Sequence, residues 1–165
     1  MTDVPRFTKH PCLTDPFITL AWVNFTRGPG NFSARPMAVH KWNDWVSKFI
    51  MTNKYWEIRD AAEITAGTLF DTSTVFARSS KREHVFLDVG ANVGYFSLLF
   101  ADRGFRVVAI EPMKRNRMAL EQTLCMNPDL RARVHIVDAA LGDHKDIVGG
   151  LSCVIRSQRL MNLGG

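Results

Sequence analysis

Residues 85–96, with the sequence VFLDVGANVGYF, constrain the fold of this chain more than any other segment. The first five are almost wholly apolar, which predicts a strand buried on both faces of a parallel sheet. Asp88 lies near the carboxyl end of that strand, where open α/β sheets bind their ligands. Gly90 and Gly94 permit the tight turn that follows, and the apolar periodicity after it predicts a helix ending near Gly104. A strand, a glycine turn and a helix therefore border a predicted ligand crevice.

Two further apolar runs also end on an acid. Residues 107–110 lead into Glu111, and residues 134–137 lead into Asp138. A helix is predicted between them, with its basic residues, Arg117 among them, facing solvent. A carboxylate after the second strand can accept hydrogen bonds from both ribose hydroxyls of a nucleoside, although an exposed strand-end charge is the alternative. Asp138 could meet the exocyclic amine of adenine or make no ligand contact.

Two commoner nucleotide motifs fail at the glycine turn. A dinucleotide fingerprint reads G-x-G-x-x-G, but Asn92 and Tyr95 occupy its second and third glycine positions here. A P-loop needs G-K-[ST] after the turn, and none follows. The spacing present, D-x-G-x-x-x-G, indicates a nucleoside-binding crevice without a pyrophosphate cradle.

Three segments together resemble one family: LDVGANVGYFSL at 87–98, AIEP at 109–112 and DAALGD at 138–143. They are similar to the FkbM-type S-adenosylmethionine-dependent methyltransferases over about residues 57–143. The resemblance implies a Rossmann-like α/β sheet, S-adenosylmethionine as cofactor, and O-methylation of a hydroxyl group on a small molecule or sugar. The implied cofactor-binding residues are Asp88, Gly90, Ala91, Asn92, Gly94, Glu111, Pro112, Asp138 and Ala139.

The same resemblance implies which part of the cofactor each of these residues contacts. Asp88, Gly90 and Asn92 would lie around its methionine part, Glu111 at the ribose and Asp138 near the adenine. Asp143 is either a further contact or a turn residue. In this fold the acceptor pocket and any general base usually come from the later half, so no catalytic residue is predicted.

Only three strong strand candidates follow residue 84, whereas a complete methyltransferase of this type has a seven-stranded sheet. We therefore expect the first half of the sheet only, from a truncated chain, with residues 85–89 as an edge strand. Bare apolar edges promote aggregation, so a second chain or an N-terminal helix is expected to cover this one. The alternative function is an inactive remnant that binds a nucleoside weakly or serves as an interaction module.

The amino-terminal half divides into two predicted parts before the sheet domain of residues 85–165. Residues 1–36 contain five prolines and are predicted as an irregular arm. Residues 37–84 are predicted as a helical extension with a second helical stretch at 58–69. Its first stretch has an apolar stripe that predicts a packing face, formed by Trp42, Trp45, Val46, Phe49 and Ile50. Tyr55 or Glu57 could approach the methionine amino group, with packing or solvent-facing roles as the alternative.

Composition and residue spacing argue against several kinds of binding partner. The net charge is +5, but the chain contains no run of five like charges. The sequence therefore does not indicate an arm that binds nucleic acid. The apolar run 17–23 is shorter than the ~20 residues of a membrane span. Neither His135 nor His144 belongs to a metal-spaced pair, so no metal is predicted.

The cysteines and two sequons bear on the compartment. Cys12, Cys125 and Cys153 are odd in number and widely spaced, which predicts free thiols in a reducing compartment and a cytoplasmic protein. The triplets NFT at 24–26 and NFS at 31–33 match the N-glycosylation sequon, a pattern that often arises by chance.

Overall fold

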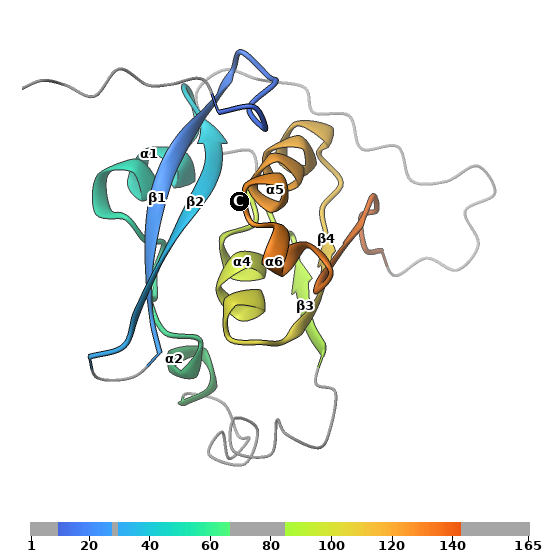
Figure 1. The fold of residues 1–165 in the computed structure, drawn as a ribbon. Coiled ribbons are helices and arrows are strands. Elements are labelled where there is room, and N and C mark those ends of the chain that lie inside the picture. Colours follow the sequence, from blue (N-terminus) through green and yellow to red (C-terminus); the bar gives the residue numbers. More distant parts are fainter. Residues whose placement is uncertain (1–9, 28–29, 67–84, 143–165) are drawn as a thin grey trace, which may run out of the picture.

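A computed structural model describes residues 10–27, 30–66 and 85–142 (Figure 1). The described chain is an α/β protein with a two-stranded antiparallel sheet and a three-stranded parallel sheet. The predictions for Asp143, His144 and Cys153 lie outside the described residues.

The predicted parallel strands and the helices between them are confirmed. The elements are β3 (Val85–Val89), α4 (Tyr95–Asp102), β4 (Arg106–Ile110), α5 (Lys114–Met126), α6 (Pro128–Arg131) and β5 (Val134–Val137). The strand order β3-β4-β5 follows the chain, as expected. In the register, Ile110 lies opposite Val89 on one side and Val137 on the other. The carboxyl ends of the three strands therefore meet at one edge of the sheet.

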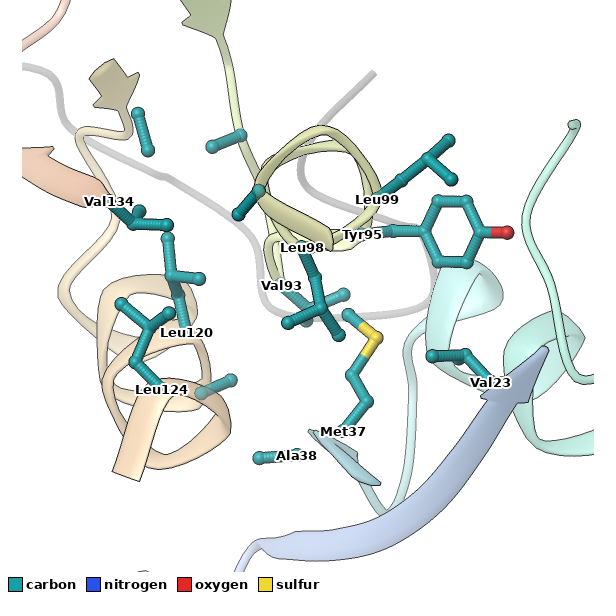
Figure 2. Close-up of a cluster of buried hydrophobic side chains, with 14 of the residues drawn as sticks. Val23, Met37, Ala38, Val93, Tyr95, Leu98, Leu99, Leu120, Leu124 and Val134 are labelled. Atoms are coloured by element: carbon teal, nitrogen blue, oxygen red, sulfur yellow. The ribbon is translucent and has the colours of Figure 1, made fainter. Parts of the chain in front are cut away.

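The apolar side chains of α4 and α5 form the centre of the core. Leu98, Leu99, Leu120 and Leu124 are fully buried, and Figure 2 shows Leu98 beside Met37 of the amino-terminal half. These side chains cover only one face of the parallel sheet. Every second residue of β3 faces the other side and is more than half exposed, namely Val85, Leu87 and Val89. The predicted burial of this strand on both faces is therefore wrong, because the described elements cover only one face. Among the described strands, β3 lies at the edge of the order β3-β4-β5, as predicted.

The irregular arm predicted for residues 1–36 is wrong where the structure describes a hairpin. Strands β1 (Ile18–Thr26) and β2 (Phe32–His40) pair antiparallel along their full length. Ala21, Val23 and Phe25 alternate inward and are buried, the period of two that a strand requires. The prolines within 1–36 suggested irregular structure, yet a proline is tolerated on an edge strand, and a two-stranded ribbon consists only of edges.

The hairpin packs on the helices rather than on the parallel sheet. Figure 1 shows α4 and α5 between the hairpin and β3–β5. The backbone N–H of Ala38 donates to the Thr123 hydroxyl of α5 at 2.9 Å, and the Phe25 ring meets the Tyr95 ring of α4 edge-on at 5.5 Å. The hairpin thus gives the helices a second apolar layer.

The predicted helical extension at 37–84 is partly wrong, because its first four residues belong to β2. Its described helices are α1 (Trp45–Asn53) and α2 (Ala61–Ala66). The packing stripe is also divided: Val46 and Ile50 are buried, whereas Trp42 and Trp45 are 59% and 60% exposed. Trp42 lies outside the helical period because Asp44 caps α1, and Trp45, the first residue of α1, lies on its exposed side.

Two of the three cysteines are not free thiols. Cys12 and Cys125 form a disulfide with their Cα atoms 5.7 Å apart, across 113 positions of sequence. The prediction of free thiols is wrong for this pair because only the fold brings the segment before β1 beside the end of α5. None of the helices in the described ranges is long and apolar enough to cross a lipid bilayer.

Candidate functional site

The glycine turn after β3 folds over the end of β4. The backbone N–H groups of Gly90 and Ala91 both donate to the Ile110 carbonyl, at 2.9 and 3.1 Å. On the other side of β4, the Glu111 N–H donates to the Val137 carbonyl at 3.1 Å. Hydrogen bonds therefore join the three strand ends to which most of the predicted site residues belong.

Glu111 holds the turn in place. Its carboxylate accepts the backbone N–H of Asn92 at 2.8 Å and that of Met113 at 2.9 Å. The Asn116 side-chain amide adds a longer contact of 3.3 Å. Glu111 is only 3% exposed, so it is not the exposed strand-end charge that was the alternative reading. A buried carboxylate with two backbone donors is well positioned to keep its orientation.

Asp88 is the second buried acid of the site. It is 7% exposed and accepts the Ser97 hydroxyl of α4 at 2.6 Å. Burial raises the pKa of the Asp88 carboxyl, the hydrogen bonds from Ser97 oppose that rise, and the neighbouring Glu111 charge adds to it. The two acids therefore interact electrostatically across adjacent strand ends.

Glycine is required at positions 90 and 94 for different structural reasons. Both have positive φ, +78° for Gly90 and +90° for Gly94, a region that favours glycine. A Cβ on Gly94 would collide with the Leu120 side chain, so this glycine lets α4 approach α5. A Cβ on Gly90 would meet nothing within 4 Å. Only Gly90 thus leaves open space at the strand ends, where a ligand could approach the backbone.

Asn92 and Ala91 complete the turn. Asn92 is half-buried with φ of +52°, a conformation that asparagine adopts more readily than most residues. Ala91 is 6% exposed and belongs to the core. The side chain of Ala91 therefore packs inward, and the turn presents mainly its backbone.

Asp138 meets an arginine that the sequence had predicted to be solvated. Arg117 Nη2 lies 2.6 Å from Asp138 Oδ2, and the Arg117 side chain is only 13% exposed. Its Nη1 donates to the carbonyls of Glu111 and Pro112 at 2.9 and 2.6 Å. The solvated role is wrong because Arg117 lies one turn into α5, facing the loop after β4. Asp138 is 70% exposed, and Pro112 and Ala139 are exposed and half-buried.

A pocket of about 470 Å³ borders this ion pair. Its lining residues are Lys114, Arg117, Met118, Glu121, Ile136 and Asp138. Asp88, Gly90, Asn92 and Glu111 do not line it, so of the predicted cofactor-binding residues only Asp138 borders this pocket.

His40, at the end of β2, reaches the site through α5. It is 4% exposed, and its Nε2 lies 3.0 Å from Asn116 Oδ1. Asn116 in turn contacts Glu111. Sequence reasoning missed both residues, and no local pattern marks them, because His40 and Asn116 are 76 positions apart.

The segment before α2 packs rather than approaching the strand ends. The Tyr55 ring packs edge-on against the Phe49 ring, with the ring centroids 5.7 Å apart. The Arg59 guanidinium lies 4.2 Å from the centroid of the Tyr55 ring. Glu57 is exposed. These positions agree with the packing and solvent-facing alternatives.

The fold and the site together define an α/β protein with two buried acids and a glycine turn at the carboxyl edge of a parallel sheet. No protein-family model, curated protein or solved structure matches the chain. Within the described residues, no group of three or more His, Cys, Asp or Glu side chains could hold a metal ion.

Proposed function

We propose that this chain is the cofactor-binding part of an S-adenosylmethionine-dependent methyltransferase with a Rossmann-like sheet. Its acceptor would be a hydroxyl group on a small molecule or sugar. One observation supports this above all: Asp88 and Glu111 lie at adjacent parallel strand ends, and the turn that contains Gly90 runs between them. Ligands of open α/β sheets bind in this place.

The residues present suit an adenosyl ligand. Gly90 leaves open space where any other residue would have a side chain. Glu111 accepts three hydrogen bonds from the protein, and a carboxylate offers about four acceptor positions. It therefore has capacity left for a ribose hydroxyl.

S-adenosylmethionine, when bound, supplies an electrophilic methyl group. The protein's task is then to orient the ligand, which it does best with groups that need not reorganise. Glu111 would orient the ribose, held by the N–H groups of Asn92 and Met113. Asp88 and the Gly90 backbone would hold the methionine part, and Asp138 would lie near the adenine amine. We assign no general base among the described residues.

A second candidate is a nucleoside-binding or interaction module without catalysis. The bare face of β3, with Val85, Leu87 and Val89 more than half exposed, favours it. An apolar edge strand is a template for pairing with another chain. A second chain that completes the sheet is therefore part of this alternative.

Titration calorimetry of the full chain with S-adenosylhomocysteine tests the cofactor claim, with adenosine as the control ligand. We expect saturable binding of S-adenosylhomocysteine that is tighter than that of adenosine. No heat from a chain that circular dichroism shows to be folded would reject the cofactor claim. Binding without methyl transfer to hydroxyl acceptors, in a sample that self-associates, would favour the interaction module.

A further inference from the structure

Both N-glycosylation sequons lie in the β1–β2 hairpin. The triplet 24–26 belongs to β1, and the triplet 31–33 begins at the turn and enters β2. Asn24 and Asn31 are both exposed in the folded chain. The Asn31 carbonyl accepts the Arg27 N–H at 2.8 Å, so its backbone is held in the turn.

The outer face of the hairpin has room for a sugar at Asn24. Side chains alternate along a strand, so the buried Val23 faces inward while Trp22 and Asn24 share the outer face. Trp22 is 51% exposed. The cross-strand partner of Asn24 is Ala34, which is exposed and small. An Asn24 glycan would therefore lie next to a small cross-strand neighbour and an exposed indole ring, while the Asn24 backbone N–H is held by the Lys54 carbonyl at 2.8 Å.

This face points away from the candidate site. The inner face of the hairpin packs on α4 and α5, and Figure 1 shows these helices between the hairpin and the parallel sheet. A sugar on the outer face would leave the carboxyl ends of β3 and β4 uncovered.

The disulfide is an independent observation that points to the same compartment. Structural disulfides form and persist in oxidising environments such as the lumen of the endoplasmic reticulum and the cell exterior. Cys12 and Cys125 are joined in the folded chain. N-glycosylation of sequons is likewise a property of secreted proteins. The disulfide therefore favours an oxidising compartment, which is where sequons are glycosylated.

We propose that Asn24 is an N-glycosylation site of this protein, with Asn31 as a second acceptor in the same hairpin. The donor is an oligosaccharide linked to a lipid diphosphate. The Asn24 side-chain nitrogen forms a bond to the anomeric carbon of the first sugar while the bond from that carbon to the diphosphate oxygen breaks. The lipid diphosphate leaves with the electron pair, a base takes one amide proton, and nothing is oxidised or reduced.

The exposed Trp22 ring offers an apolar surface on which the glycan can pack. The apolar face of the first sugar can cover the exposed indole two residues before Asn24, which removes apolar surface from water. The glycan therefore shields the outer face of the hairpin as well as modifying it. Phe32, 70% exposed beside Asn31, offers a similar surface to the second glycan.

The test uses the protein purified from its native cells with thiols blocked at lysis. Peptide N-glycosidase F in ¹⁸O-water converts a glycosylated asparagine into labelled aspartate, which peptide mass spectrometry locates. We expect label at Asn24 and Asn31. Returned to the same cells, Asn24→Gln and Thr26→Ala should each remove one glycan's mobility shift, since Thr26→Ala keeps Asn24 but destroys the sequon. Trp22→Ser should keep the glycan but narrow the difference in Tm between glycosylated and deglycosylated protein.

The proposal would be overturned if neither Asn24 nor Asn31 of the native protein acquired the ¹⁸O label. This holds whether or not Cys12 and Cys125 are joined in that protein. Label at Asn31 alone would overturn the assignment of Asn24. An unchanged Tm difference in Trp22→Ser would reject the role of the indole ring. None of these outcomes depends on S-adenosylhomocysteine binding.

Discussion

The Glu111 carboxylate accepts the backbone N–H of Asn92 at 2.8 Å, which joins the turn after β3 to the residue that follows β4. The same carboxylate accepts the Met113 N–H, so one side chain fixes two loops. Any ligand bound by these strand ends would find both loops already in position. Removal of this charge should therefore affect stability and binding together.

Glu111→Gln places an amide where both backbone N–H groups need an acceptor. One of them then faces an NH₂ group, and an unsatisfied buried donor costs about 1–3 kcal/mol of unfolding free energy. Urea unfolding should show a loss of that size. Calorimetry should show S-adenosylhomocysteine affinity reduced by about tenfold or more, since tenfold is about 1.4 kcal/mol. Glu57→Gln, at an exposed position that does not line the pocket, is the matched control. Unchanged affinity would remove Glu111 from the proposed ribose site.

Asp88→Asn should stabilise the free protein and weaken ligand binding. Burial raises the pKa of Asp88, so the folded state binds the proton more tightly than the unfolded state does. The resulting loss of stability begins near the ordinary carboxyl pKa of about 3.9 and is complete once pH exceeds the raised folded pKa. Asn carries no charge and still accepts the Ser97 hydroxyl. Thermal unfolding at pH 7 should give a higher Tm than wild type, and a lower Tm would contradict this account.

Asp102→Asn should weaken the contact between the hairpin and α4. Its fully buried carboxylate accepts Arg27 at 2.6 Å and Arg35 at 2.8 Å, and both guanidinium groups are partly exposed. Breaking a buried pair costs about 3–5 kcal/mol. We expect the lower end of this range or about 1 kcal/mol less, because water can reach both arginines. Asp129→Asn removes an exposed partner of Arg35 and serves as the control in urea unfolding.

The same residue predicts a pH dependence. Burial by itself raises the pKa of Asp102, but hydrogen bonds and charge from Arg27, Arg35 and Ser33 outweigh it and hold the pKa below its usual value. The stabilisation is therefore fully present above the unfolded pKa of about 3.9 and is lost as pH falls through the lower folded pKa. The free energy of unfolding of wild type should fall more steeply below about pH 4 than that of Asp102→Asn. Parallel curves for the two proteins would contradict the prediction.

The double variant Cys12→Ala and Cys125→Ala should unfold at lower urea. A native disulfide typically contributes about 2–4 kcal/mol, more for long loops, and this one closes 113 positions of sequence. The wild type should lose a similar amount in reductant, while the double variant should keep the same midpoint with and without reductant. Equal midpoints with and without reductant would show that the bridge does not stabilise the fold.

The parallel half of the fold could be predicted because its signals are local. Apolar runs of four or five residues, each ending on an acid, identified β3, β4 and β5. Gly90 and Gly94 identified the turn. The hairpin was missed because the prolines of residues 1–36 were weighed above the alternation of β1, although a two-stranded ribbon tolerates proline.

The sequence by itself determined that Asp88, Glu111 and Asp138 lie at the ends of consecutive parallel strands, since parallel strands joined by crossover helices place their carboxyl ends at one edge of the sheet. Only the tertiary structure decided which side chains meet them. Arg27 reaches Asp102 across 75 positions, and Cys12 meets Cys125 across 113. No local sequence pattern identifies such partners, because they come together only when the hairpin buries its apolar face on α4 and α5.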